Sequence, residues 1–569
     1  MREVVTIQLG DFANFIGSHF WNFQDELLGL VGDPDTDPVF KNHGLDMDVL
    51  YRSGETQEGA LTYTPRLVSV NYQGTLGSMS SSGTLYNQIP ELSPSVATWR
   101  GSLSVQHSQR QRRNLFLQRL YDEEKIQPSG VENGHADSQN DNQDKNIVES
   151  LENDVHFWTD FSKVHYHPQS IYEVSGLWMD GQEFNNYGAG KDVFSEGFRG
   201  EEMNERLRFF LEECDHIQGI QFLVDDSGGF SSVAENFLQN IADEYTNTPV
   251  MLYTVRDPRS HMGSTSRKRN ISRDLHDAVS FARLSPFCKL IIPVGLPSLG
   301  KASSYLHVND AKPYHCSAVY AAALHSLSLP FRMDLPGPAS ISSGTYGALN
   351  INEIVQTLSG QNRQNMVTIL DAAVPAPYLT GKPSEEPILS NLQSLTPEVS
   401  EGAEDPQSVE TLVVNGALRS EGHRASVSEV QQAISAAYGQ AVLRPRFCHL
   451  SVATCPLPIP LPFPTIFSDT VSQSGQLLGT PNPSCVLKGS LDVHSIPMAA
   501  RLRSSSAVLP FLSNRLENLR KLGIQQGAIG GELLKTWGFG REEVEEMGET
   551  VSKMVRALDP YSDTSSDSD

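Results

Sequence analysis

Cysteine is scarce in this chain, with six residues among 569, and no two of them are spaced as CxxC. The spacing matches no zinc-binding pattern, so neither a zinc module nor a disulfide framework is predicted. The N-terminus also lacks the apolar run of a secretory signal peptide. We therefore expect buried free thiols in a reducing cytosol.

Long apolar runs without charge are equally rare, and the longest candidate for a membrane helix covers residues 447–468. Prolines alternate there with apolar residues, at Pro456, Pro458, Pro460, Pro462 and Pro464. Proline at every second position removes amide donors and forbids a helix, so we expect an extended or edge segment, or polyproline II. No transmembrane segment is predicted, and any membrane association is expected to be peripheral or through a partner.

Basic residues are outnumbered, 43 against 68 acidic ones, which gives a formal charge of −25 and a pI near 5.0. This balance argues against nucleic acid or an anionic membrane as the main partner. Segments 121–154, 379–412 and 540–569 carry net charges of −8, −6 and −6, which leaves about −5 for the body. The argument against nucleic acid and anionic membranes therefore holds for these three segments. It is weaker for the body, where a local basic patch could bind either of them.

Common catalytic and phosphate-binding motifs are missing. Gly190-Lys191 is followed by Asp192, so there is no Walker A sequence, and GxGxxG, GxSxG and HExxH are absent too. Glycine-bearing turns do lie near strand–helix junctions, at 10–17, 188–190 and 228–229. Such turns let backbone amides approach a phosphate, although a glycine after a strand more often makes only a tight turn.

Strand and helix patterns alternate over the first 335 residues, which predicts a parallel α/β sheet with right-handed crossovers. The expected strands are 4–10, 63–70, 219–224, 249–255 and 290–294, and the expected helices are 14–30, 201–214, 232–245 and 314–329. Later strands are expected at 365–374 and 411–417, and later helices at 427–438, 505–522 and 541–558. The polar, acidic stretch 121–154 is typical of disorder.

Several motifs resemble tubulin, in order along nearly the whole chain. They are the opening segment Met1–Asn14 with Ile16-Gly17 and Phe20-Trp21, the segment 63–68 with Gly74-Thr75, the loop Gly188-Ala189-Gly190, the segment 214–219, Gly347–Asn350, and the Glu-rich segment 537–558. The insert 121–154 and the segment Trp158–Phe161, leading to His167–Ser170, further resemble the Misato family of tubulin-like proteins.

This resemblance implies a Rossmann-type parallel-sheet N-terminal domain, a second α/β domain and C-terminal helices. The implied bounds are 1–120 and 155–335 for the two parts of the first domain, 121–154 for a disordered acidic insert, 345–500 for the second domain with an acidic loop at 379–412, 505–560 for the helices and 561–569 for an acidic tail. The Misato family is associated with mitochondrial distribution, morphology and fusion, in the cytoplasm and at the outer membrane.

The residues that serve nucleotide chemistry in tubulin are altered here. Tubulin has Gln and Cys after its first glycine, where this chain has Asp11 and Phe12, and a carboxylate repels phosphate unless a cation intervenes. Two carboxylates that serve magnesium are replaced by the amides in 71–73, which weakens a hard-cation site. The glycine loop is reduced to 226–232, and the catalytic loop has Asn352 and Val355 at its two acidic positions, with Glu353 two positions early.

We therefore predict no catalytic residue, no metal and no cofactor, and at most a degenerate nucleotide pocket. Its residues would be Gly10, Asp11, Asn14, Gly17, Gly74, Gly188, Ala189, Gly190, Gly228 and Gly229. The leading function is a non-enzymatic regulator of mitochondrial distribution, morphology and fusion, with outer-membrane, tubulin or chaperone components as partners and no nucleic acid. The alternatives are a GTP-binding cytoskeletal protein and a tubulin assembly or folding factor.

Other candidate residues favour structural roles. His165 and His167 would share one face of a strand, but no further metal ligand lies nearby. His315-Cys316 precedes an apolar helix without a recognisable base or oxyanion motif, so a buried thiol is expected. The basic clusters at 110–113 and 267–269 are more typical of a solvated face than of a docking site.

Overall fold

The computed structural model describes most of the chain and contains two six-stranded sheets. The described residues are 2–55, 61–80, 113–126, 137–178, 184–194, 197–262, 266–300, 303–333, 344–359, 365–380, 387–400, 402, 405–441, 444–479, 486–525 and 527–559. The predicted acidic tail at 561–569 lies outside these residues, as do Cys485 and positions 127–136 of the insert.

The first sheet has the strand order β5-β4-β1-β6-β7-β8, and every neighbouring pair is parallel. Its strands are β1 Glu3–Leu9, β4 Leu67–Gln73, β5 Ile171–Trp178, β6 Ile217–Asp225, β7 Val250–Val255 and β8 Leu290–Val294. The predicted parallel α/β sheet is thus confirmed. All six carboxyl ends lie at one edge, where ligands bind in folds of this kind.

Helices cover both faces of this sheet, because its strands are buried on both sides. In β6, Phe222 and Val224 enter one core and Leu223 enters the other. Helices α1 Asp11–Gly32 and α9 Pro313–Ser328 cover one face. Helices α5 Tyr187–Lys191, α6 Arg199–Glu212, α7 Phe230–Glu244 and α8 Arg267–Leu284 cover the other.

The second sheet has the order β11-β10-β16-β12-β13-β9, and only β12 and β13 pair in parallel. Its strands are β9 Thr345–Tyr346, β10 Ile369–Ala373, β11 Gln393–Ser394, β12 Val409–Asn415, β13 Phe447–Ala453 and β16 Met498–Ser504. Helices α10 Ile351–Ser359 and α12 Val427–Gln440 accompany it. The two sheets meet at β8, where the Ile291 amide donates to the Met366 carbonyl at 2.7 Å.

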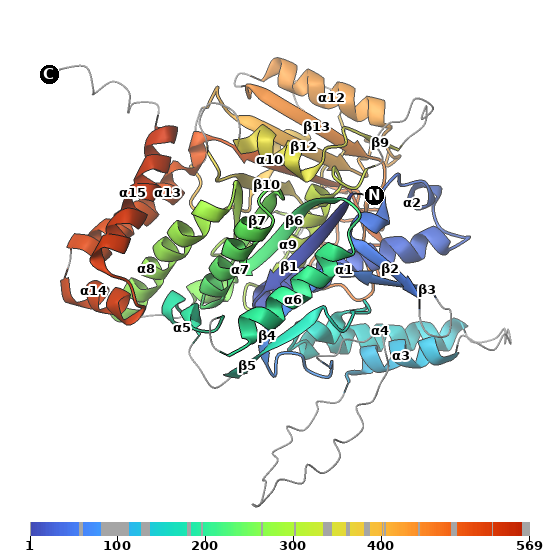
Figure 1. Cartoon of the computed structure of the whole chain (residues 1–569). Helices are drawn as coiled ribbons and strands as arrows, with labels where there is room; N and C mark the ends of the chain where they lie inside the picture. The colour runs from blue at the N-terminus through green and yellow to red at the C-terminus, as the bar shows by residue number, and fades with distance from the viewer. Residues whose placement is uncertain are drawn as a thin grey trace, which may run out of the picture.

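The C-terminal helices stack beside α8, as the red and green ribbons of Figure 1 show. They are α13 Leu509–Asn518, a π-helix at Leu519–Gln525, α14 Gly527–Thr536 and α15 Arg541–Leu558. The single helix predicted over 505–522 is therefore divided, beginning with a 3-10 turn at Ser506–Val508. The apolar residues of α13 pack in the core that also contains α7 and α8.

The prediction of disorder over 121–154 is wrong where the structure describes this segment. Helix α3 spans Leu115–Ile126 and helix α4 spans Asp137–Asp154, and the two lie side by side (Figure 1). The acidic loop 379–412 is likewise interrupted, by helix α11 at Pro387–Ser390, by β11, and by β12 from Val409. Composition misled here because contacts with distant residues, described below, hold the end of α4.

The shorter elements include two small antiparallel strand pairs. They are α2 Pro38–Lys41, the pair β2 Tyr51–Glu55 and β3 Leu61–Pro65, the pair β14 Leu457–Pro458 and β15 Ser495–Ile496, and 3-10 turns at Met47–Val49, Trp158–Phe161, Pro258–His261 and Ser285–Phe287. The run predicted at 63–70 is split between β3 and β4. The proline-rich segment is extended, as predicted, in β13 and β14.

Among the described helices, none combines the length and the apolar composition needed to cross a membrane.

Candidate functional site

Four of the predicted glycines meet at the carboxyl ends of β1 and β6. Gly10 follows β1 with a φ of 96°, a backbone conformation that side-chain-bearing residues rarely adopt. A Cβ at Gly190 would lie 1.9 Å from the Gly229 carbonyl oxygen, and one at Gly228 would lie 2.2 Å from the Phe184 carbonyl oxygen. The turns at 188–190 and 228–229 therefore touch each other directly.

Gly17 and Gly188 serve packing elsewhere. A Cβ at Gly17 would lie 2.1 Å from Gln8 Nε2, so glycine at this position lets α1 approach β1. A Cβ at Gly188 would lie 2.4 Å from the Trp537 ring, so glycine there makes room for the tryptophan that follows α14. Both glycines are explained by protein contacts.

Gly74 and Ala189 complete two of the turns. Gly74 has a φ of 89°, and its amide donates to Glu173 Oε1 at 3.3 Å. A Cβ at Gly74 would meet no atom of the described residues within 4 Å, so no such protein contact requires glycine's lack of a side chain there. The Ala189 amide donates to Asn186 Oδ1 at 3.0 Å, which caps the start of α5.

Asn14 is fully buried, and its side chain is committed to neighbours. Its Nδ2 donates to Asn71 Oδ1 at 2.8 Å, and its Oδ1 accepts from Ser69 Oγ at 2.9 Å. Trp158 Nε1 also donates to Asn71 Oδ1, at 3.0 Å. Asn71 stands where the resemblance expected a lost magnesium-serving carboxylate, and it now links β4 to α1 and to Trp158.

Three aromatic rings fill the room beside the glycine turns. The Tyr72, Phe184 and Phe230 centroids lie 5.2 Å (72 to 184), 4.8 Å (72 to 230) and 5.2 Å (184 to 230) apart, all in edge-to-face geometry. A Cβ at Gly10 would lie 2.9 Å from the Phe230 ring, and one at Gly229 would lie 2.6 Å from the Phe184 ring. We call Tyr72, Phe184 and Phe230 the aromatic triad. The glycines thus admit aromatic rings at the places where a phosphate would need backbone amides.

Carboxylates occupy the same region. The Phe12 amide donates to Asp225 Oδ2 at 3.3 Å, and Ser227 Oγ donates to Asp225 Oδ1 at 2.5 Å. Burial raises the pKa of Asp225, and burial together with the charge of Asp225 raises the pKa of Asp11 to about 7. Negative charge at this edge disfavours a phosphate.

The raised pKa of Asp11 predicts a pH-dependent stability. In the folded chain the pKa of Asp11 is about 7, against its ordinary value of 3.8, so the folded state binds this proton more tightly. The resulting stabilisation is complete below pH 3.8 and is lost as the pH rises through 7. Asp11→Asn should therefore raise the free energy of unfolding by about 1–2 kcal/mol at pH 8, a figure reduced for partial exposure, with no gain at pH 4.

The measurement is urea unfolding of both proteins across this pH range. Asp215→Asn is the control, since Asp215 is exposed, and its substitution should leave the profile unchanged. Equal gains for Asp11→Asn at pH 4 and pH 8 would contradict the raised pKa of this half-buried carboxyl group.

Arg256 secures the turn after β6, and no motif around it predicted this role. Its Nε donates to Asp226 Oδ1 at 3.1 Å, and its Nη1 donates to Asp277 Oδ2 at 2.7 Å. A third bond runs from Nη2 to the Asp226 carbonyl at 3.4 Å. The Asp226 and Asp277 carboxylates are therefore paired with Arg256, which is itself buried.

The loop that resembles tubulin's catalytic loop forms a helix cap. The Asn350 amide donates to Glu353 Oε2 at 2.8 Å, and the Glu353 amide donates to Asn350 Oδ1 at 2.9 Å. This reciprocal pair is a capping box at the start of α10. Glu353, the acidic residue nearest to the altered positions, is therefore engaged with its own helix.

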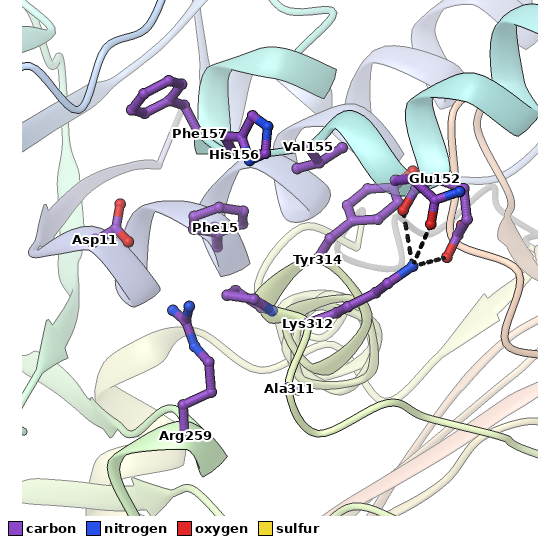
Figure 2. A pocket seen from close by; sticks show the side chains of 12 residues that line it. Asp11, Phe15, Glu152, Val155, His156, Phe157, Arg259, Ala311, Lys312 and Tyr314 are labelled. Carbon is purple, nitrogen blue, oxygen red and sulfur yellow. Dashed lines mark hydrogen bonds and ion pairs between the residues drawn. The ribbon is translucent and has the colours of Figure 1, made fainter. Parts of the chain in front are cut away.

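A cavity of about 280 Å³ remains beside the first turn of α1 (Figure 2). Its lining comprises Asp11, Phe15, Glu152, Asn153, Val155, His156, Phe157, Arg259, Ala311, Lys312, Pro313 and Tyr314. Of the ten predicted site residues it includes only Asp11. Figure 2 shows Arg259 extending toward the Asp11 side, whereas Lys312 extends toward α4.

Glu152 anchors the end of α4 at this cavity. It accepts from Lys312 Nζ at 3.3 Å and from Thr465 Oγ1 at 2.9 Å, and it pairs with His315 Nε2. Burial alone would raise the pKa of Glu152, but His315 and Thr465 outweigh it and lower the pKa to about 2. The insert is thus tied to α9 and to the second half of the chain.

The histidine and cysteine candidates have structural contacts. The His167 ring stacks on Phe209, with centroids 4.9 Å apart. Cys316 is fully buried, and burial raises the pKa of its thiol. Cys288 and Cys455 are buried too, whereas Cys214 and Cys448 are half-buried, so the expectation of buried thiols holds only in part. Within the described ranges, no group of three or more histidine, cysteine, aspartate or glutamate side chains is placed to hold a metal.

The parallel sheet, the second sheet and the converging glycine turns define a tubulin-like α/β protein, and residues 148–333 match the family model described as "Tubulin domain". Residues 2–122 match the model described as "Misato Segment II tubulin-like domain". Together with the relatives below, this shows that the chain belongs to the Misato family. Residues 123–147, between the two matched regions, fall within the predicted insert.

Relatives cover most of the chain. "Protein misato homolog 1" of Mus musculus is 30% identical over 98% of this chain and 97% of its own length. The protein of the same name from Homo sapiens is 34% identical over 58% of this chain and 60% of its own length. "Protein DML1" of Gibberella zeae is 27% identical over 66% of this chain and 68% of its own length.

Proposed function

We propose that this chain is a non-enzymatic regulator of mitochondrial distribution, morphology and fusion that acts through protein partners. It would work in the cytoplasm and as a peripheral protein at the mitochondrial outer membrane, without binding nucleic acid. Membership of the Misato family supports the regulatory role. The observation that carries the non-enzymatic part is the aromatic triad packed against the glycine turns.

Nucleotide binding would have to dismantle this packing. Phe184 and Phe230 are 8% and 3% exposed, and exposing both rings would cost about 3–6 kcal/mol. The incoming phosphates would also have to displace Asp225 from the Phe12 amide. Asp11 would add repulsion once ionised. These costs favour a protein-binding fold over a GTPase.

Cells that lack the protein provide the test. Mitochondria should fragment or cluster in null cells, and the wild-type chain should restore the network. The variant Glu353→Gln should rescue equally well, because an amide oxygen still accepts from the Asn350 amide while the acid is removed. A normal network in null cells would contradict the regulatory role, and failure of a stably expressed Glu353→Gln variant would contradict the non-enzymatic role.

The two alternatives differ from this proposal in measurable ways. A GTP-binding cytoskeletal protein should form sedimenting polymers when GTP is added. A tubulin assembly or folding factor should retain tubulin or chaperone subunits during purification, and its loss should lower the level of assembled tubulin before mitochondria change shape. Mitochondrial change that precedes any change in tubulin supports the proposed function.

A further inference from the structure

A second cavity, of about 330 Å³, lies between the turn after β6 and the first turns of α8. Its lining comprises Phe184, Asn185, Ser227, Arg256, Ser260, Arg269, Asn270, Ser272, Arg273 and Asp277. It shares no lining residue with the cavity at Asp11. Phe184 belongs to the aromatic triad and separates this cavity from the filled turn at Gly229.

The lining is basic in a strongly acidic chain. Three arginines, Arg256, Arg269 and Arg273, face one carboxylate, Asp277, whereas the whole chain has 43 basic and 68 acidic residues. Arg256 is already paired, with Asp277 at 2.7 Å and with Asp226 at 3.0 Å. Arg269 and Arg273, which make no buried ion pair with the described residues, supply the positive charge that this lining offers to an anion.

Several donors in this lining are uncommitted. The Arg269, Asn270 and Ser272 side chains make no hydrogen bond or ion pair with any part of the chain that the structure describes. Arg273 has one loose ion pair, with Asp274 at 3.5 Å, and both side chains are more than a third exposed. A surface pair of this kind contributes little, so Arg273 can turn to a ligand at small cost.

We propose that this cavity binds a phosphomonoester group. A guanidinium donates two parallel hydrogen bonds to phosphate oxygens, and amide and hydroxyl donors suit the remaining oxygens. The volume exceeds that of a bare phosphate and is in the lower range of small-molecule sites, so an organic moiety fits with it. The group could belong to a soluble metabolite or to a lipid headgroup. This inference goes beyond the proposed function and does not depend on it.

The test uses the full-length chain and two phosphomonoester probes. Soluble glycerol 3-phosphate is titrated by calorimetry, and vesicles of phosphatidylcholine with phosphatidic acid are used for sedimentation. Vesicles with phosphatidylserine at matched charge report non-specific attraction. Binding to the soluble probe supports a metabolite, and binding to phosphatidic acid above phosphatidylserine supports a lipid source. Binding to neither probe would overturn the proposal.

A pair of matched double variants identifies the site. Arg269→Gln with Arg273→Gln removes two charges from the lining and should raise Kd about tenfold or more. Arg267→Gln with Lys268→Gln removes two charges from the same helix outside the lining, where both side chains are exposed, and should change Kd less than about twofold. Equal losses in the two variants would show diffuse surface attraction and overturn the assignment. Unchanged unfolding midpoints for both establish that the fold is intact.

Discussion

Replacing Phe230 by alanine is expected to lower the free energy of unfolding by about 3–5 kcal/mol. The ring is 3% exposed, and it contacts Tyr72 and Phe184 in edge-to-face geometry. Alanine would leave a cavity that Gly10 and Gly229 cannot fill, because neither has a side chain. A large loss is therefore predicted at a position where a ligand-binding loop would tolerate substitution.

Chemical unfolding followed by intrinsic fluorescence measures this loss, and Phe198→Ala is the matched control. Phe198 is 72% exposed, so its substitution should change stability by less than about 0.5 kcal/mol. If Phe230→Ala were as mild as the control, the aromatic triad would be loosely packed, and the case against a nucleotide pocket would lose its main support.

Removing the Asp371 carboxylate should destabilise the second sheet by about 3–5 kcal/mol. Asp371 on β10 accepts from Arg501 Nη2 at 2.7 Å and from Arg503 Nε at 3.2 Å, with its side chain 2% exposed. Arg501 also forms an ion pair with Glu410 on β12, at 3.4 Å. Asp371→Ala would leave two guanidinium groups with one carboxylate in a region from which water is largely excluded.

The control for this network is an exposed ion pair. Arg541 and Glu545 on α15 lie 2.8 Å apart, with side chains 81% and 46% exposed, so Glu545→Ala should cost less than about 1 kcal/mol. Comparable losses in Asp371→Ala and Glu545→Ala would mean that the buried network is hydrated and weak.

The sequence predicted the central strands well because their signals are local. The runs in β1, β6, β7 and β8 are mostly apolar and almost entirely buried, which is typical of strands covered on both faces. Helix α4 was missed because its order depends on distant partners. Glu152 reaches Lys312, His315 and Thr465, more than a hundred residues away, and local composition carries no trace of these contacts.

In the candidate site, too, local features could be predicted from the sequence and contacts between distant residues could not. Glycines 10, 190, 228 and 229 could be placed at turns from the sequence, since each lies near the end of a strand or the start of a helix. The residues that fill the turns could not be predicted as a group. Phe230 directly follows Gly228 and Gly229 in the sequence, so a bulky ring near the turn could have been noticed. Tyr72 and Phe184 contact one another and Phe230 from remote segments, which the sequence does not indicate.

The glycine turns of this tubulin-like chain are packed with protein side chains where a nucleotide would lie. The most direct test is the guanine-nucleotide content of the purified chain after denaturation, measured by chromatography, with tubulin purified in parallel as the positive control. We expect no stoichiometric nucleotide and no GTP turnover above a denatured sample. Guanine nucleotide retained in one-to-one proportion, or turnover that follows the folded protein, would contradict this expectation.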